Sequence, residues 1–152
     1  MKLCNHRGRA GVSAFLIAGL ASVFLVSGGV AAHEPDKPYR VDCEQTDEEG
    51  RRFCETDRGT YVGWRTYHAA CHVCHGQDGV GSSFAPNLVE RLKHIDETRF
   101  RTAVNEGVSG QMGVMPGFGQ NPNVRNFVDE LYSYLLARSD GVLRPGRPKW
   151  TE

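Results

Sequence analysis

The stretch TYHAACHVCHG, residues 66–76, places two cysteines and a histidine within five positions: Cys71, Cys74 and His75. Three kinds of site use this C-x-x-C spacing: a redox-active dithiol, half of a zinc site, and a point where haem is bonded to the chain. Each kind of site needs different residues elsewhere in the protein. The rest of the sequence therefore decides which of the three kinds of site this motif forms.

The zinc and dithiol interpretations are poorly supported by the rest of the sequence. A structural zinc site needs four nitrogen or sulfur ligands. No cysteine follows Cys74, and His94 is the only histidine after His75, so a second ligand pair downstream is missing. A dithiol oxidoreductase carries its C-x-x-C at the start of a helix, usually after an apolar strand. Here the residues before the motif have helical spacing instead.

Haem attachment makes demands that this chain can meet. The thiols of Cys71 and Cys74 can bond to the two vinyl groups along one porphyrin edge, and the adjacent His75 then binds the iron. Met115, in the glycine-rich GVMPGFG, is the candidate for the second axial ligand. Pro86, in FAPNL, can offer a backbone carbonyl that fixes the His75 ring through its second nitrogen. These five residues form the predicted site of one covalently bound haem c.

Other side chains compete with Met115 for the second axial position. Met112 lies in the same loop, but no proline follows it to hold the chain extended beside the ligand. His68 lies on the helix that leads into the motif, on the side of His75, so it cannot readily cross the porphyrin ring. For His68 and His94 a packing or surface role is the better explanation, and Met115 is the preferred ligand.

Residues 1–32 have the pattern of a signal peptide. Lys2, Arg7 and Arg9 precede an uncharged run that ends in the small residues VAA, which suits cleavage after Ala32. A retained membrane anchor is the alternative, because the run approaches the roughly 20 residues that span a bilayer. Its Gly, Ser and Ala content favours cleavage, so we expect a periplasmic protein without a stable membrane anchor. Cleavage leaves 15 basic against 18 acidic residues, so a basic surface for nucleic acid is not expected.

Residues 33–62 form a polar, acidic N-terminal extension. Two short extended pieces, RVDCE and RRFCE, flank the turn QTDEEG and carry Cys43 and Cys54. Disulfides form and persist in an oxidising compartment. We therefore expect a Cys43–Cys54 disulfide, worth roughly 3 kcal/mol in the chain-entropy model. Two free thiols are the alternative.

The chain from residue 63 to residue 141 is predicted to be a helical domain with long loops. Helical spacing leads into the motif, a short helix is expected over 88–94, and another runs from its cap Asp96 to Glu106. The best-marked helix follows Asn121 and continues nearly to Gly141. Residues 142–152 form a tail with two prolines. Because no strand is expected outside the N-terminal extension, the predicted fold class is all-α.

Five motifs in a fixed order resemble a class I c-type cytochrome: GWRTY, CHVCH, APNL, MPGFG and ELYSYL. In that family the first and last helices cross where a glycine meets an aromatic residue, here Gly63 and Tyr134. A residue without Cβ lets two helices approach closely. The resemblance implies helices and loops wrapped around one haem, and an electron carrier rather than an enzyme.

Longer segments, YVGWRTYHAACHVCHGQDGVGSSFAPNL and YSYLLARSDGVLRPGRP, resemble a narrower group. They are similar to periplasmic cytochromes that accompany PQQ-dependent alcohol and methanol dehydrogenases. Cys43 and Cys54 resemble a four-cysteine branch of these, related to methanol metabolism. The resemblance implies such a dehydrogenase as electron donor and a downstream cytochrome c or terminal oxidase as acceptor.

Two alternatives belong to other classes of function. One is a haem enzyme, or a gas- or peroxide-binding protein, whose methionine ligand dissociates from the iron. The other is a disulfide-stapled binding module without a cofactor. The second leaves the order of Pro86, Met115 and the Gly63–Tyr134 pair unexplained.

Overall fold

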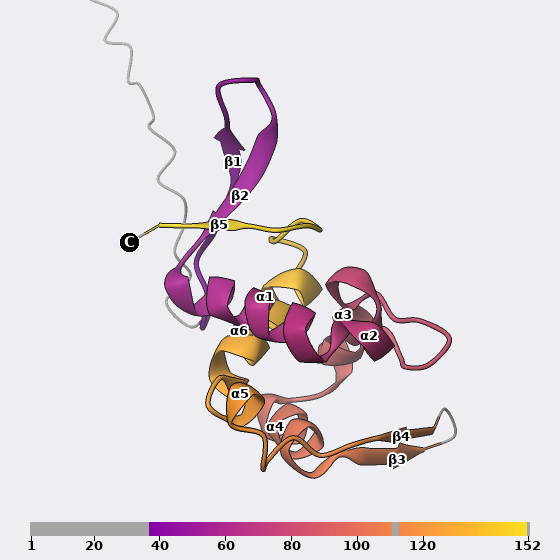
Figure 1. The fold of residues 1–152 in the computed structure, drawn as a ribbon. Helices are drawn as coiled ribbons and strands as arrows, with labels where there is room; N and C mark the ends of the chain where they lie inside the picture. The colour runs from indigo at the N-terminus through magenta and orange to yellow at the C-terminus, as the bar shows by residue number, and fades with distance from the viewer. Residues whose placement is uncertain (1–36, 111–112, 152) are drawn as a thin grey trace, which may run out of the picture. The chain divides into compact units, whose positions relative to one another are not determined.

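The computed structural model describes residues 37–110 and 113–151 (Figure 1). The predicted signal peptide and the rival ligand Met112 lie outside the described residues. Within that part of the chain, no helix is both long enough and apolar enough to cross a bilayer.

Helices α1 (Arg58–Ala70) and α6 (Val128–Ser139) pack against each other at the centre of the fold. A Cβ on Gly63 would come within 1.8 Å of the backbone O of Glu130 and within 2.9 Å of Tyr134 Cβ. Only a glycine therefore permits this approach, and the predicted meeting of Gly63 and Tyr134 is confirmed. Tyr67 and Leu131 are buried in the same interface, where a fully buried large side chain contributes about 1.5–3 kcal/mol.

Helix α1 begins at Arg58, five residues before the predicted start of the helical domain. Its N-cap is Asp57, whose carboxylate accepts a hydrogen bond from the backbone N of Thr60 at 3.0 Å. Such a cap satisfies one of the free N–H groups of the first turn. The first turn, DRGT, has no large apolar side chain, so the spacing of apolar residues could not mark it as helical.

The smaller helices lie between α1 and α6 in the sequence. They are α2 (His72–His75), η1 (Gln77–Gly79), α3 (Leu88–Arg91), η2 (Leu92–His94), α4 (Glu97–Glu106) and α5 (Pro122–Arg125). The helices predicted over 88–94 and after Asp96 are confirmed, the first as α3 followed by η2. The single helix predicted after Asn121 is two helices. Phe127 leaves helical geometry, with φ −131° and ψ 24°, and its N–H closes a tighter turn on Val124 O.

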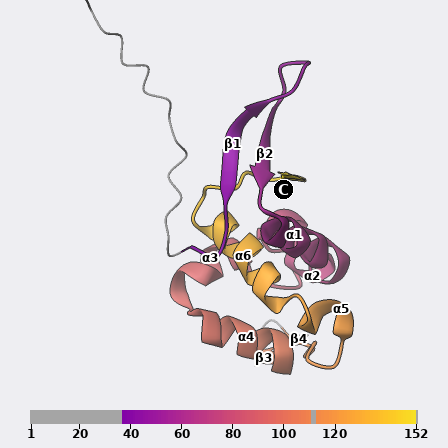
Figure 2. The same cartoon turned by 90° about the vertical axis from the view of Figure 1, so that its left-hand side faces the viewer.

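The prediction of an all-α fold is wrong, because the described residues are 47% helix and 17% strand, with two β-sheets. One sheet has the order β1 (Val41–Thr46), β2 (Arg52–Thr56), β5 (Lys149–Trp150), with β1 and β2 antiparallel and β5 parallel to β2. The other pairs β3 (Val108–Gly110) with β4 (Gly113–Met115). Figures 1 and 2 both show the β1–β2 hairpin and the β3–β4 pair on opposite sides of α1 and α6.

The predicted hairpin in the N-terminal extension is confirmed as β1 and β2, and the Cys43–Cys54 disulfide joins them. The tail is docked on the rest of the fold. Its strand β5 pairs with β2, and the N–H of Thr151 donates to Thr56 O at 3.1 Å. The extension and the tail therefore form one small sheet at one end of α1.

Candidate cofactor site

A cavity of about 610 Å³ lies beside the CxxCH motif. Cys71, Cys74 and His75 line it together with Met115 and Pro86, so the structure gathers all five predicted site residues at one place. Its walls are apolar and include Leu92, Phe100, Val104, Leu131 and Leu135. Cofactor sites are typically of this size and character.

The CxxCH motif forms a single turn of backbone that directly follows α1. Cys71 ends α1 and precedes α2, and its carbonyl accepts hydrogen bonds from the N–H of Cys74 (3.2 Å) and of His75 (2.9 Å). Both cysteines are free thiols. Burial is the main cause that raises the pKa of the Cys71 thiol to about 11, and the neighbouring Cys74 is the second cause. A redox-active dithiol needs a lowered thiol pKa, so this environment does not suit that chemistry.

His75 is buried, with 6% of its surface exposed. Its Nδ1 lies 3.0 Å from the backbone O of Pro86. If the N–H of the ring donates to that carbonyl, Nε2 is left as the lone-pair nitrogen of an imidazole that lines the cavity. The chain returns to this point through Gly76, where a Cβ would lie 2.2 Å from Gly81 O and φ is +74°. A glycine is needed there both for the left-handed backbone and for the close approach.

Met115 ends strand β4 and is half-buried against the core. The following loop is tied to the end of α4, because the N–H of Phe118 donates to Val104 O at 2.8 Å and that of Gly119 to Asn105 O at 3.0 Å. A Cβ on Gly117 would lie 2.7 Å from Asn105 O. The glycine-rich sequence therefore lets the loop lie directly on α4, which brings Met115 to the cavity.

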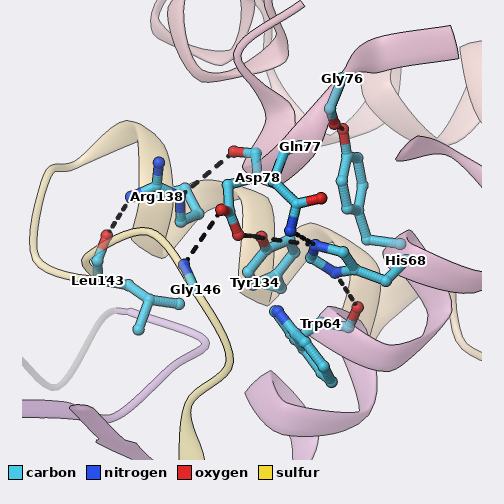
Figure 3. Close-up of polar contacts among 10 residues, drawn as sticks. Trp64, His68, Gly76, Gln77, Asp78, Tyr134, Arg138, Leu143 and Gly146 are labelled. Atoms are coloured by element: carbon cyan, nitrogen blue, oxygen red, sulfur yellow. Dashed lines mark hydrogen bonds and ion pairs between the residues drawn. The ribbon is translucent and has the colours of Figure 1, made fainter. Parts of the chain in front are cut away.

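The two competing histidines do not line the cavity. His68 Nδ1 lies 2.9 Å from Trp64 O, and His68 Nε2 lies 3.2 Å from Gln77 Nε2 (Figure 3). His94 is exposed in η2. The structure thus places both in the packing and surface roles that the sequence favoured. No group of three or more His, Cys, Asp and Glu that could hold a metal occurs among the described residues.

Sequence reasoning missed a buried polar network next to the motif, centred on Asp78 (Figure 3). The Asp78 carboxylate accepts from Tyr134 OH at 3.2 Å and from the N–H of Gly146 at 3.1 Å. Arg138 Nε donates to the Asp78 backbone O at 3.3 Å, and another Arg138 nitrogen donates to Leu143 O. The network ties the turn after the motif to α6 and the tail. An aspartate between Gln77 and Gly79 gave no sequence signal of burial.

Two buried tyrosines complete the support of this turn. Tyr67 OH donates to Gly76 O at 2.6 Å, and Tyr134 OH donates to Asp78. Burial is the main cause that raises the pKa of each phenol above its usual value. Both hydroxyls therefore remain protonated donors across the physiological pH range.

Comparison with known proteins agrees with this site. A family model described as cytochrome C oxidase, cbb3-type, subunit III matches residues 60–135. Cytochrome c-553I of Paracoccus denitrificans is 44% identical over 96 residues, which are 60% of this chain and 42% of that protein. Cytochrome c-555 of Methylococcus capsulatus is 37% identical over 91 residues, 59% of this chain and 71% of that one. The chain thus spans less than half of the Paracoccus relative.

A solved structure is also similar. The crystal structure of the c-type cytochrome XoxG from Methylobacterium extorquens AM1 matches with a TM-score of 0.62 and 36% identity. The match covers 80% of this chain and 77% of that one.

The site fits the cofactor of this family. Two free thiols, an imidazole and a thioether converge on one apolar cavity, which is the donor set that a covalently bound haem with two axial ligands requires. The resemblance found in the sequence is therefore confirmed. The chain belongs to the class I c-type cytochromes, which carry covalently bound haem c.

Proposed function

We propose that this protein is a periplasmic one-electron carrier whose haem is attached through Cys71 and Cys74, with His75 and Met115 as the axial ligands. The observation that carries this assignment is the cavity itself, which is lined by all four side chains although Met115 lies far along the chain from the motif. The proposed carrier domain is residues 63–141, preceded by a cleaved signal peptide (1–32) and the stapled extension (33–62), and followed by the tail (142–152).

Each residue has a distinct task in this assignment. The Pro86 carbonyl holds the His75 ring in the tautomer that presents Nε2 to the metal. The mostly apolar walls lower the local dielectric constant, so the charge of the site is screened less than it would be in water. Bound haem supplies the one-electron step, and a methionine ligand raises its reduction potential. Because His75 and Met115 would both hold the iron, no position would be left open for oxygen or peroxide.

The proposed electron donor is a PQQ-dependent methanol or alcohol dehydrogenase, and the acceptor is a downstream cytochrome c or terminal oxidase. The support is the narrower likeness of the segments around GSSFAP and ARSDG, together with the two extra cysteines that form the disulfide. The match to XoxG adds a structural neighbour of the same class. The carrier is not itself expected to oxidise the alcohol.

A partner would dock on the apolar side chains around the motif. Val73, Phe84 and Val114 are 71%, 74% and 76% exposed, and the last two line the cavity. Weak redox encounters use small interfaces, and three such side chains suit one. The acidic turn at 47–49 is a weaker candidate for steering, because Arg51 forms ion pairs with Asp47 (2.8 Å) and Glu49 (3.1 Å).

Two measurements on the purified holoprotein test the proposal. Stopped-flow mixing with a reduced PQQ-dependent methanol dehydrogenase should reduce the carrier in a second-order reaction. Exposure of the reduced protein to carbon monoxide should leave its spectrum unchanged, since both axial positions are filled. Rapid carbon monoxide binding would instead support the gas- or peroxide-binding alternative, and no reduction by the dehydrogenase would contradict the proposed donor.

A further inference from the structure

Two arginines interrupt the otherwise apolar lining of the cavity. Arg91 lies at the end of α3 and Arg99 lies in the first turns of α4, and both line the cavity. They are its only lining residues with a permanent charge among the described residues. Both are exposed to solvent, and a cation that an occupant of the cavity would cover is costly to desolvate unless an anion accompanies it.

The helical spacing places both arginines on the faces that form the cavity wall. Arg91 is three residues after Leu88 and four before Ile95, and Arg99 is four before Ala103. All five of these residues line the cavity. Residues three and four apart share one face of a helix, so Leu88 and Arg91 lie on one face of α3, and Arg99 and Ala103 on one face of α4. Both arginines are exposed, so each guanidinium lies where the cavity meets solvent.

Neighbouring charged side chains on these elements already have partners. Lys93 pairs with Glu90 at 2.8 Å, and Arg101 pairs with Glu97 and Asp129. Neither Arg91 nor Arg99 has a side-chain hydrogen bond or ion pair with any other described residue. The two cations that line the cavity are therefore the ones left available for a bound anion.

We propose that Arg91 and Arg99 bind the two propionate carboxylates of the haem. This rests on the proposed function. The propionates lie on the porphyrin edge away from the two vinyl groups, so the cofactor would be held by thioether bonds at one edge and by ion pairs at the other. Two cations match two carboxylates in charge, and the planar guanidinium suits a carboxylate in a bidentate pair.

The arrangement has a consequence for the redox equilibrium. Oxidation adds one positive charge to the haem, so a nearby guanidinium disfavours the ferric state and raises the reduction potential. The same guanidinium keeps the propionate ionised to lower pH. Arg91 and Arg99 would thus set both the potential and the pH range over which it changes.

The test is the reduction potential of the holoprotein as a function of pH in Arg91→Gln, Arg99→Gln and the double variant. The matched control is Arg65→Gln, an exposed arginine of α1 that does not line the cavity. At pH 8 and a fixed electrode potential, we expect each cavity variant to lower the ratio of reduced to oxidised protein by about two- to fivefold, the range for a partly exposed charge pair. The pH range over which the reduction potential changes should move to higher pH, because the propionate carboxylates lose the cations that lowered their pKa.

Arg91→Lys and Arg99→Lys keep the charge and the fold, so they should retain most of the wild-type potential. The proposal is overturned if the Gln variants match Arg65→Gln in both potential and pH profile, or if the Lys variants shift as far as the Gln variants. In either case haem attachment and the axial ligands, and with them the proposed function, would stand. A wild-type protein that binds no haem would overturn both.

Discussion

At the scale of single residues, the backbone around the motif is specified by a few positions that tolerate no substitute. Gly63 lets α1 lie on α6, and Gly76 lets the loop return so that Pro86 reaches His75. Asp78 then joins this turn to α6 and to the tail through its carboxylate and its carbonyl. The cofactor site is therefore supported by residues that do not touch the cavity.

Asp78→Asn should lower the free energy of unfolding by about 1–3 kcal/mol, the cost of an unsatisfied buried polar group. The carboxylate accepts from both Tyr134 OH and the Gly146 N–H, whereas an amide turns an NH₂ group toward one of these donors. Urea denaturation of the holoprotein measures the change. Asp129→Asn, at a side chain that is 75% exposed with one ion pair, is the control and should cost below about 1 kcal/mol. Equal losses in the two variants would contradict a special role for Asp78.

At the scale of elements, the extension and the tail act as a small sheet that braces α1 and α6 from outside the cofactor cavity. The disulfide holds β1 to β2, and β5 adds to the other edge of β2. Lys37 and Tyr39, just before β1, both hydrogen-bond Asp140, just after α6. Stability and cofactor chemistry should therefore be separable.

Replacing both Cys43 and Cys54 by serine should lower the free energy of unfolding by about 2–4 kcal/mol, because the unfolded chain loses a cross-link. Neither residue lines the cavity. The visible spectrum and the reduction potential of the holoprotein should therefore be unchanged, while its Tm falls. A shift in potential as large as that expected for Arg91→Gln would show that the hairpin acts on the cofactor after all.

The contact of Asp140 with the extension should make stability depend on pH. Burial alone would raise the pKa of Asp140, but the hydrogen bonds from Tyr39 and Lys37 outweigh it and lower the pKa below its usual value of 3.8. Its stabilising contribution is therefore full above the unfolded pKa and is lost as the pH falls through the folded pKa. The stability difference between wild type and Asp140→Asn, below about 1 kcal/mol at neutral pH, should shrink as the pH falls below 4. A difference that persists at pH 2 would contradict this.

At the scale of the whole molecule, the cofactor chemistry was predictable and part of the architecture was not. The CxxCH motif, Pro86 and Met115 could be singled out as candidates because haem chemistry needs particular donors that are rare in this chain, and the structure gathers them at one cavity. Helix α4 could be predicted from its cap Asp96 and its apolar spacing. These signals are local, so a single sequence carries them.

The strands outside the extension carried no such signal. Strands β3 and β4 lie in the glycine-rich segment 107–119, which shows no clear alternation, and β5 has two residues. Their pairing depends on where α4 and β2 lie in the folded protein. The burial of Asp78 is equally non-local, because its partners Tyr134 and Gly146 come from α6 and the tail.

Docking is also a property of the whole surface. Val73→Asp should lower the second-order rate constant for reduction by the proposed dehydrogenase by about five- to tenfold, since a charge replaces an apolar contact near the motif. Val142→Asp makes the same change at an exposed valine of the tail, outside the CxxCH motif, so it is the control and should leave the rate nearly unchanged. Equal rates in wild type and Val73→Asp would place the docking face elsewhere.

The central claim is that one haem c is bonded to Cys71 and Cys74 and bound axially by His75 and Met115. The most direct measurement is the absorption spectrum of the oxidised protein, matured with a haem-attachment system, in the red region where a weak methionine-to-iron band appears. The band should be present in the wild type, persist in Met112→Ala and vanish in Met115→Ala. A band that survives Met115→Ala, or haem attached without any such band, would contradict the assigned ligands.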